Sequence, residues 1–159
     1  MKALVIYDTQ YGNTEKIALA IGERLRSRGE VTVLRVGDVK LEHLAGLDLL
    51  VIGSPTQAFR ATGATKKMLA SIPKNGLKGL KVAAFDTRLI IEEVDSRILP
   101  PFVKVFGYAA KPMADTLVKK GGHLVVPPEG FFVKGMEGPF KEGELERAAE
   151  WAEGILAAL

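Results

Sequence analysis

The sequence contains no cysteine, and this absence excludes disulfides, thiolate-bound iron–sulfur clusters and thiolate zinc sites. Any redox chemistry must therefore come from a bound cofactor. A chain without cysteine also agrees with a reducing compartment, and we take the cytoplasm as the expected location. Histidine is scarce, with two in the whole chain, and no spacing of ligand residues indicates a metal site.

Long hydrophobic runs and charge of one sign are also missing. The apolar run that follows Met1 and Lys2 stops at Asp8, which is too short for a signal sequence or a membrane span. There are 22 lysines and arginines against 19 aspartates and glutamates, and the basic residues are scattered. Nucleic-acid binders usually carry a basic stripe with interleaved aromatic residues. We therefore expect neither a membrane nor a nucleic acid as a partner.

The composition is that of a globular protein. The chain has 159 residues, of which 47% are apolar and 26% charged, enough to build one core without disulfide or metal support. No repeat, low-complexity tract or linker interrupts the sequence. We expect a single domain over residues 1–159.

Apolar runs alternate with segments of helical periodicity. We predict strands at residues 3–7, 31–36, 47–52, 81–85 and 123–126, with an extension at 131–133 left open. We predict helices from Thr14 onward, over 64–72 and over 142–159, the last with Leu145, Ala148 and Ala152 on its inner side. This alternation predicts a parallel sheet covered by helices on both faces. Such sheets bind ligands outside the carboxyl ends of their strands, so the informative residues should follow the first, third and fourth strands.

The loop after the first strand contains hydrogen-bond donors that could bind a phosphate. Thr9 and Thr14 carry hydroxyl donors, Asn13 carries an amide donor, and Gly12 lets the backbone approach closely. The loop opens a helix, where backbone amides and the helix dipole favour an anion. The alternative is that Asn13 or Thr14 merely caps the helix while Gly12 shapes a turn. Neither the dinucleotide-binding glycine pattern nor a nucleotide-triphosphatase loop is present.

This part of the chain resembles the flavodoxin family. Residues 4–18 are similar to the family's phosphate loop, Thr/Ser-x-x-Gly-Asn-Thr-Glu, with its flanks, and resemble the flavodoxin domains attached to diiron enzymes that reduce oxygen or nitric oxide. The resemblance implies a three-layer, doubly wound α/β fold with a five-stranded parallel sheet in the order 2-1-3-4-5, and FMN as cofactor. It implies that Tyr11 lies near the flavin edge and that the FMN phosphate is held by Thr9, Gln10, Gly12, Asn13 and Thr14.

The loop after the third strand resembles the family's Gly-Ser-Pro-Thr stretch, which wraps one side of the flavin ring. The matching residues are Ser54, Pro55, Thr56 and Gln57. Pro55 stiffens the turn, while Thr56 and Gln57 offer donors and acceptors to the ring's polar edge. The alternative is an ordinary turn at a strand exit. Many flavodoxins flip a peptide at a glycine in this loop, but residues 54–62 contain no glycine.

The third flavin loop is expected at Asp86, Thr87 and Arg88, after the fourth strand. Many flavodoxins place a stacking tyrosine or tryptophan here, whereas residues 86–96 contain no aromatic residue. Arg88 has two alternatives: it reaches the flavin's pyrimidine edge, or it pairs with Asp86 or Glu92 at the surface.

An apolar stretch at residues 97–108 surrounds two prolines. Our hypothesis is that this insertion covers the flavin or docks a partner, supplying the aromatic side chain that the third loop lacks. The alternative is core packing of a long helix. The stretch also offers a surface for a homodimer.

The resulting functional prediction is an FMN-binding electron carrier that passes electrons between redox partner proteins, rather than a stand-alone oxidoreductase. One alternative is a small NAD(P)H-dependent flavin or quinone reductase, and another is a non-redox interaction module of the same fold without FMN. A phosphoacceptor receiver domain is disfavoured, because it needs an aspartate after the third strand and a lysine after the fifth. Those places hold Ser54 and the pair Pro127 and Pro128.

Overall fold

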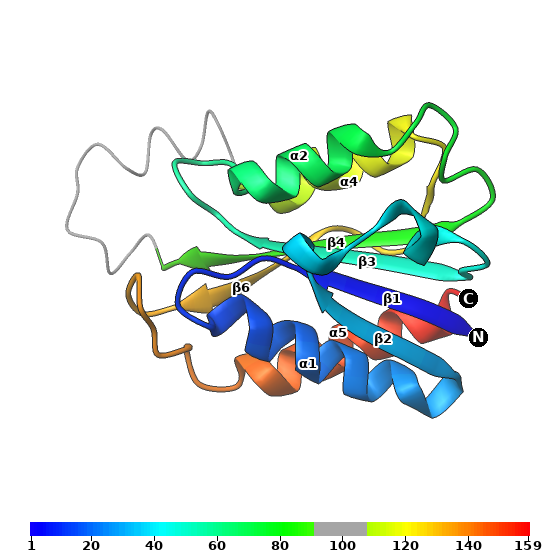
Figure 1. Ribbon diagram of the computed structural model, residues 1–159. Coiled ribbons are helices and arrows are strands. Elements are labelled where there is room, and N and C mark those ends of the chain that lie inside the picture. The colour runs from blue at the N-terminus through cyan, green and yellow to red at the C-terminus, as the bar shows by residue number, and fades with distance from the viewer. Residues whose placement is uncertain (91–107) are drawn as a thin grey trace.

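The computed structural model describes residues 1–90 and 108–159 of the chain (Figure 1). The strands are β1 (Lys2–Tyr7), β2 (Glu30–Arg35), β3 (Leu49–Pro55), β4 (Lys81–Leu89), β5 (His123–Leu124) and β6 (Glu129–Val133). The helices are α1 (Asn13–Leu25), α2 (Gly63–Ser71), α4 (Ala110–Lys119) and α5 (Glu144–Ala157). The predicted segments are therefore present, with bounds that differ by a few residues.

All strand pairs in the described residues are parallel, and the strand order is β2-β1-β3-β4-β5. This confirms the predicted sheet. The predicted fifth strand is divided, because β5 pairs with the start of β4 and β6 pairs with its end, along Phe85 to Leu89. Pro127 and Pro128 lie between the two segments. Proline has no amide hydrogen to give to the ladder, which explains the interruption.

The sheet is the middle of three layers. Figure 1 shows α2 and α4 together on one face and α1 and α5 on the other. Side chains of β1 alternate between the two sides, so Leu4 and Ile6 belong to the core under α2 and α4, while Ala3 and Val5 belong to the core under α1 and α5. This alternation buries both faces, as a continuous apolar strand requires.

Strands β3 and β4 run further than predicted. Ser54 and Pro55 still belong to β3, and residues 86–88, predicted as a loop, belong to β4. Ser54 pairs with Asp86 and Pro55 with Thr87, while β6 supports the same stretch of β4 from its other side. Because these partners are distant in sequence, the local apolar pattern does not reveal them.

The prediction for the last helix was wrong at one position. Leu145 is 42% exposed rather than turned inward, and the neighbouring Glu144 is buried. The reason is that the Glu144 carboxylate accepts a hydrogen bond from the Phe132 amide, at 2.7 Å, and so faces β6. Ala148 and Ala152 do pack inward as predicted.

Two further observations bear on the sequence-based hypotheses. Of the apolar stretch at 97–108, only Tyr108 lies within the described residues, so the hypothesis about this insertion falls outside them. Within 1–90 and 108–159, every helix is too short or too polar to cross a lipid bilayer.

Candidate functional site

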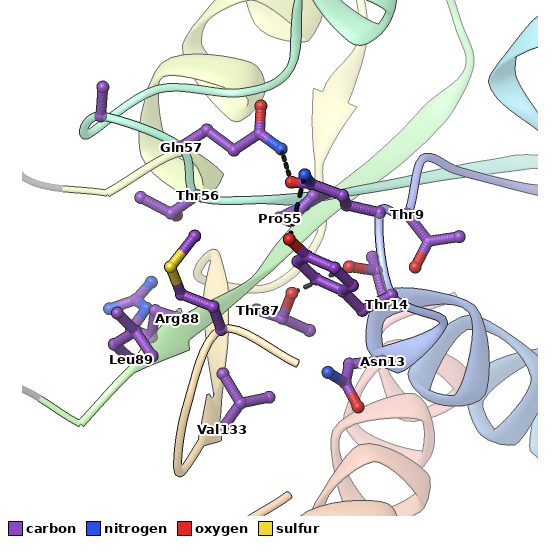
Figure 2. Close-up of a pocket in the computed structure, with 14 residues that line it drawn as sticks. Thr9, Asn13, Thr14, Pro55, Thr56, Gln57, Thr87, Arg88, Leu89 and Val133 are labelled. Atoms are coloured by element: carbon purple, nitrogen blue, oxygen red, sulfur yellow. Dashed lines mark hydrogen bonds between the residues drawn. The ribbon is translucent and has the colours of Figure 1, made fainter. Parts of the chain in front are cut away.

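A pocket of about 440 Å³ lies at the carboxyl ends of β1, β3, β4 and β6 (Figure 2). Its size is in the usual range of small-molecule sites. The structure brings together most residues predicted from the three loops, namely Thr9, Gln10, Tyr11, Asn13, Thr14, Pro55, Thr56, Gln57, Thr87 and Arg88. Gly12, Ser54 and Asp86 were predicted as well but do not line it. The lining residues that the sequence did not indicate are Ala58, Leu89, Val133 and Met136.

The first loop leaves the start of α1 open toward this pocket. Gly12 occupies the N-cap position in the left-handed region, with φ of 88°, and no side chain caps the helix. The proposal that Asn13 or Thr14 caps the helix was therefore wrong. The Thr9 hydroxyl oxygen instead accepts the Gly12 amide hydrogen at 2.8 Å. Glycine suits this position because other residues are strained at such a φ.

Thr14 and Thr87 connect the first helix to β4 beneath the pocket. Their hydroxyl oxygens are 2.8 Å apart, and both side chains are buried (Figure 2). A hydroxyl has one hydrogen, so the bond between the two uses one of their two hydrogens. The other hydrogen can be donated to a further acceptor, such as a ligand in the pocket.

The Asp8 carboxylate anchors the first loop through hydrogen bonds, although the sequence analysis did not predict it as a site residue. One carboxylate oxygen accepts the Thr62 hydroxyl hydrogen at 2.6 Å, and the other accepts the Thr9 amide hydrogen at 2.9 Å. Arg35 approaches the same carboxylate at 3.5 Å and donates to the Thr9 carbonyl at 2.8 Å. These bonds fix Thr9 where it lines the pocket.

The second loop makes a tight reverse turn. The amides and carbonyls of Gln57 and Arg60 bond to each other at 2.8 and 2.9 Å, and the two residues between them, Ala58 and Phe59, have φ of 44° and 67°. This is the geometry of a type I′ turn, which usually contains glycine or asparagine. The Gln57 side-chain amide donates to Gln10 at 2.7 Å and so ties the second loop to the first (Figure 2).

Arg88 lines the pocket and pairs with Asp86 at the same time. Its guanidinium donates to the two Asp86 oxygens at 2.6 and 2.8 Å, and its Cζ lies 3.7 Å from the centre of the Tyr108 ring. Asp86 is fully buried and also accepts the Ala110 amide hydrogen at 2.8 Å. Burial raises the pKa of Asp86, while Arg88 acts to lower it. Arg88 therefore does pair with Asp86, as one alternative had it, but the pair is mostly below the surface, with the Asp86 side chain fully buried and the Arg88 side chain 17% exposed.

The lining residues fit a phosphate joined through a polyol chain to a flat ring that has one apolar and one polar edge, which is the composition of FMN. Thr9, Asn13 and Thr14 gather hydroxyl and amide groups at an uncapped helix N-terminus, which favours an anion. The apolar part of the pocket wall is formed by Tyr11, Leu89, Val133 and Met136. Among the described residues that line the pocket there is no carboxylate, and Arg88 is the one cation.

The family model and the curated relative that match this chain belong to the same family. The model of the family described as Flavodoxin matches residues 5–87. A curated flavodoxin from Aquifex aeolicus is 44% identical over 57 residues, which cover 35% of this chain and 31% of that protein. The match therefore spans about a third of the curated relative.

Solved structures agree in fold along the whole chain. Oxidised Flavodoxin 1 from Bacillus cereus has a TM-score of 0.78 at 17% identity, covering 100% of this chain and 99% of its own. A flavodoxin from the domain Archaea has a TM-score of 0.74 at 24% identity, with 99% of both chains covered. Rubredoxin oxygen:oxidoreductase from Desulfovibrio gigas has a TM-score of 0.74 at 20% identity, and the match covers 99% of this chain and 35% of that protein.

Proposed function

Because the chain belongs to the flavodoxin family, we propose that it binds FMN without a covalent bond in the pocket at the carboxyl ends of the strands and carries electrons between redox partner proteins. The observation that supports this most is the meeting of neutral phosphate donors and apolar wall in one pocket. The isoalloxazine ring of FMN supplies the electron-carrying chemistry, and the protein supplies binding, orientation and electrostatics.

The first loop would hold the phosphate. Thr9, Gln10, Asn13 and Thr14 present neutral donors, and Gly12 allows the backbone to come close. No lysine or arginine lies between Asp8 and Thr14. The negative charge would therefore be balanced by hydrogen bonds and by the positive end of the α1 dipole, with Tyr11 at the flavin edge.

The second loop and the end of β4 would hold the ring. Pro55, Thr56 and Gln57 line the pocket directly, together with Thr87 and Arg88. Two predicted residues would act from behind. Ser54 donates to the Pro55 carbonyl at 3.0 Å and accepts the Thr62 amide hydrogen at 3.0 Å, and Asp86 orients Arg88.

A comparison of two flavins tests this proposal. The purified protein is stripped of ligand and titrated with FMN and with riboflavin, which lacks the phosphate, while flavin absorbance and fluorescence are followed. We expect saturable FMN binding and a much weaker affinity for riboflavin. Absence of FMN binding would leave only the interaction module, and equal affinities would remove the phosphate from the first loop.

The rival activity is separated by a kinetic measurement on the FMN-loaded protein. An electron carrier should oxidise reduced nicotinamide slowly unless a reductase is added. Rapid, saturable oxidation of NADH or NADPH by the protein alone would instead establish a flavin or quinone reductase.

A further inference from the structure

The chain between β6 and α5 forms a compact hairpin, which we call the 132–141 hairpin. The Lys141 amide donates to the Phe132 carbonyl at 3.0 Å, and the Lys134 amide donates to the Pro139 carbonyl at 2.9 Å. At its tip, the Gly138 amide donates to the Gly135 carbonyl at 3.0 Å. This last bond closes a β-turn whose central residues are Met136 and Glu137.

The 132–141 hairpin packs against the first loop. A Cβ atom added to Gly138 would lie 2.9 Å from the Asn13 side-chain oxygen and 3.1 Å from its nitrogen. Gly138 also has a positive φ of 100°. Contact with the first residue of α1 and the bonds across the hairpin therefore fix the place of the turn.

Met136 stands on this turn at the pocket wall. It is 70% exposed, and it lines the pocket together with Val133 and Leu89. A large apolar side chain left in water at a pocket wall gains free energy when a ligand covers it. A thioether also makes favourable contacts with aromatic rings.

Such a contact matters because few aromatic side chains of the described residues are available near the end of β4. The described part of the chain after Phe85 reaches Ile90 without an aromatic residue. Tyr108 does not line this pocket and lies under the Arg88 guanidinium. Tyr11 is therefore the one aromatic side chain among the described residues that line the pocket.

We propose that Met136 packs its thioether side chain against the flavin ring and takes the role that a second stacking aromatic residue would fill. This inference rests on the proposed function, since it concerns the ring of the same ligand. It assigns ring affinity to the 132–141 hairpin and phosphate affinity to the first loop. The two contributions are thereby separable by experiment.

The test measures FMN and riboflavin affinity for the wild type, Met136→Ala, Met136→Leu and Leu41→Ala. Leu41 is a matched control, because it is 54% exposed and does not line the pocket. We expect Met136→Ala to weaken both flavins by the same factor, roughly tenfold. Met136→Leu should restore most of the affinity, and Leu41→Ala should change nothing. Bound-flavin fluorescence should differ between the wild type and Met136→Ala.

The outcomes that overturn the inference are distinct from failure of the proposed function. If the wild type binds FMN and Met136→Ala binds both flavins as tightly, Met136 does not contact the ring. If the variant weakens FMN but not riboflavin, the side chain serves the phosphate end and the inference is wrong. If the wild type binds no FMN, the proposed function itself fails. A thermal melt of each apoprotein checks folding, and the exposure of Met136 predicts no change.

Discussion

At the scale of single residues, removal of the Thr14 hydroxyl is the most direct test of the proposed phosphate site. Its bond to Thr87 holds it beneath the pocket, and valine removes the hydroxyl with little change in shape. A hydrogen bond to a charged group contributes about 1.5–3 kcal/mol, so Thr14→Val should weaken FMN binding by roughly tenfold or more. Riboflavin affinity should not change, because it has no phosphate.

The control for this titration is Ser27→Ala, which removes an exposed hydroxyl just beyond the other end of α1. It should bind both flavins like the wild type. Equal weakening of FMN and riboflavin by Thr14→Val would mean that the variant disturbs the whole pocket rather than its phosphate end.

The pair of Asp86 and Arg88 shows how the pocket carries a cation without net charge. The Asp86 carboxylate is fully buried and accepts two hydrogen bonds from Arg88, so the positive charge at the pocket wall is balanced directly behind it. A partly buried ion pair of this kind is screened less by salt than a pair at the surface. A ligand in the pocket would meet a fixed, oriented guanidinium rather than a mobile surface charge.

Residue identity allowed prediction of some of the site but not all of it. Thr9, Asn13 and Thr14, which line the pocket, were predicted because donors around a glycine at a strand-to-helix junction have a direct chemical meaning. Met136 was not predicted, since an isolated methionine in a glycine-containing turn carries no periodic or chemical signal. Its place depends on the packing of Gly138 against Asn13, which no local pattern reveals.

At the scale of elements, the turn of the second loop stores backbone strain. Ala58 has a φ of 44°, where residues other than glycine are disfavoured by about 1 kcal/mol or more. Ala58→Gly should therefore raise the free energy of unfolding of the apoprotein by about 0.5–1 kcal/mol, after the larger entropy loss of glycine is subtracted. Urea denaturation measures this change.

A matched control substitution, Ala70→Gly, should change the free energy of unfolding in the opposite direction. Ala70 is exposed in α2, where glycine costs about 0.5–1 kcal/mol relative to alanine. Ala70→Gly should accordingly lower the free energy of unfolding. A loss of stability in both variants would show that the turn at Ala58 is not strained.

The start of α5 is joined to β6 by Glu144, and this link should depend on pH. Burial acts to raise the pKa of Glu144, but the hydrogen bonds from Arg147 and from the Phe132 amide outweigh it and hold the pKa below the ordinary 4.5. A carboxylate with a lowered pKa stabilises the fold above its unfolded-state value, and this contribution is lost as the pH falls through the folded value. Glu144→Gln should therefore cost about 1–3 kcal/mol at neutral pH.

The same variant should differ less from the wild type at about pH 3 than at neutral pH, because lowering the pH toward the folded-state pKa of Glu144 reduces the contribution of its charge to stability. The free energy of unfolding by urea, measured at both pH values, gives the comparison. Glu146→Gln serves as control, because Glu146 is exposed on the same helix and should change stability by less than about 0.5 kcal/mol at either pH. A pH-independent cost for Glu144→Gln would contradict the assigned role of its charge.

The elements themselves were predictable where burial and periodicity act locally. Residues 3–7 read as a strand because an unbroken apolar run suits a strand covered on both faces, and β1 has that position. The ends of β3 and β4 were not predictable, because Ser54 and Asp86 are polar and are held in the sheet by pairing with each other. The split of the last strand had a visible cause in Pro127 and Pro128.

At the scale of the whole molecule, the pocket depends on nearly every layer. Its walls come from the ends of β1, β3, β4 and β6, and its open helix terminus belongs to α1. These elements are distant in sequence and are brought together by the parallel sheet and its two helical faces. Global unfolding must therefore destroy the site.

This dependence leads to a prediction about the stability of the entire chain. A ligand that binds the folded state alone stabilises it by RT ln(1 + [L]/Kd), which is about 2.7 kcal/mol at a hundred times Kd. FMN at that concentration should raise the free energy of unfolding by about this amount, as measured by urea denaturation, and riboflavin at equal concentration should raise it less. Thr14→Val should shift the FMN dependence to higher concentration by the factor found in direct titration. Tight FMN binding without any gain in stability would mean that flavin binds the unfolded chain equally well, which a pocket assembled from four strand ends does not allow.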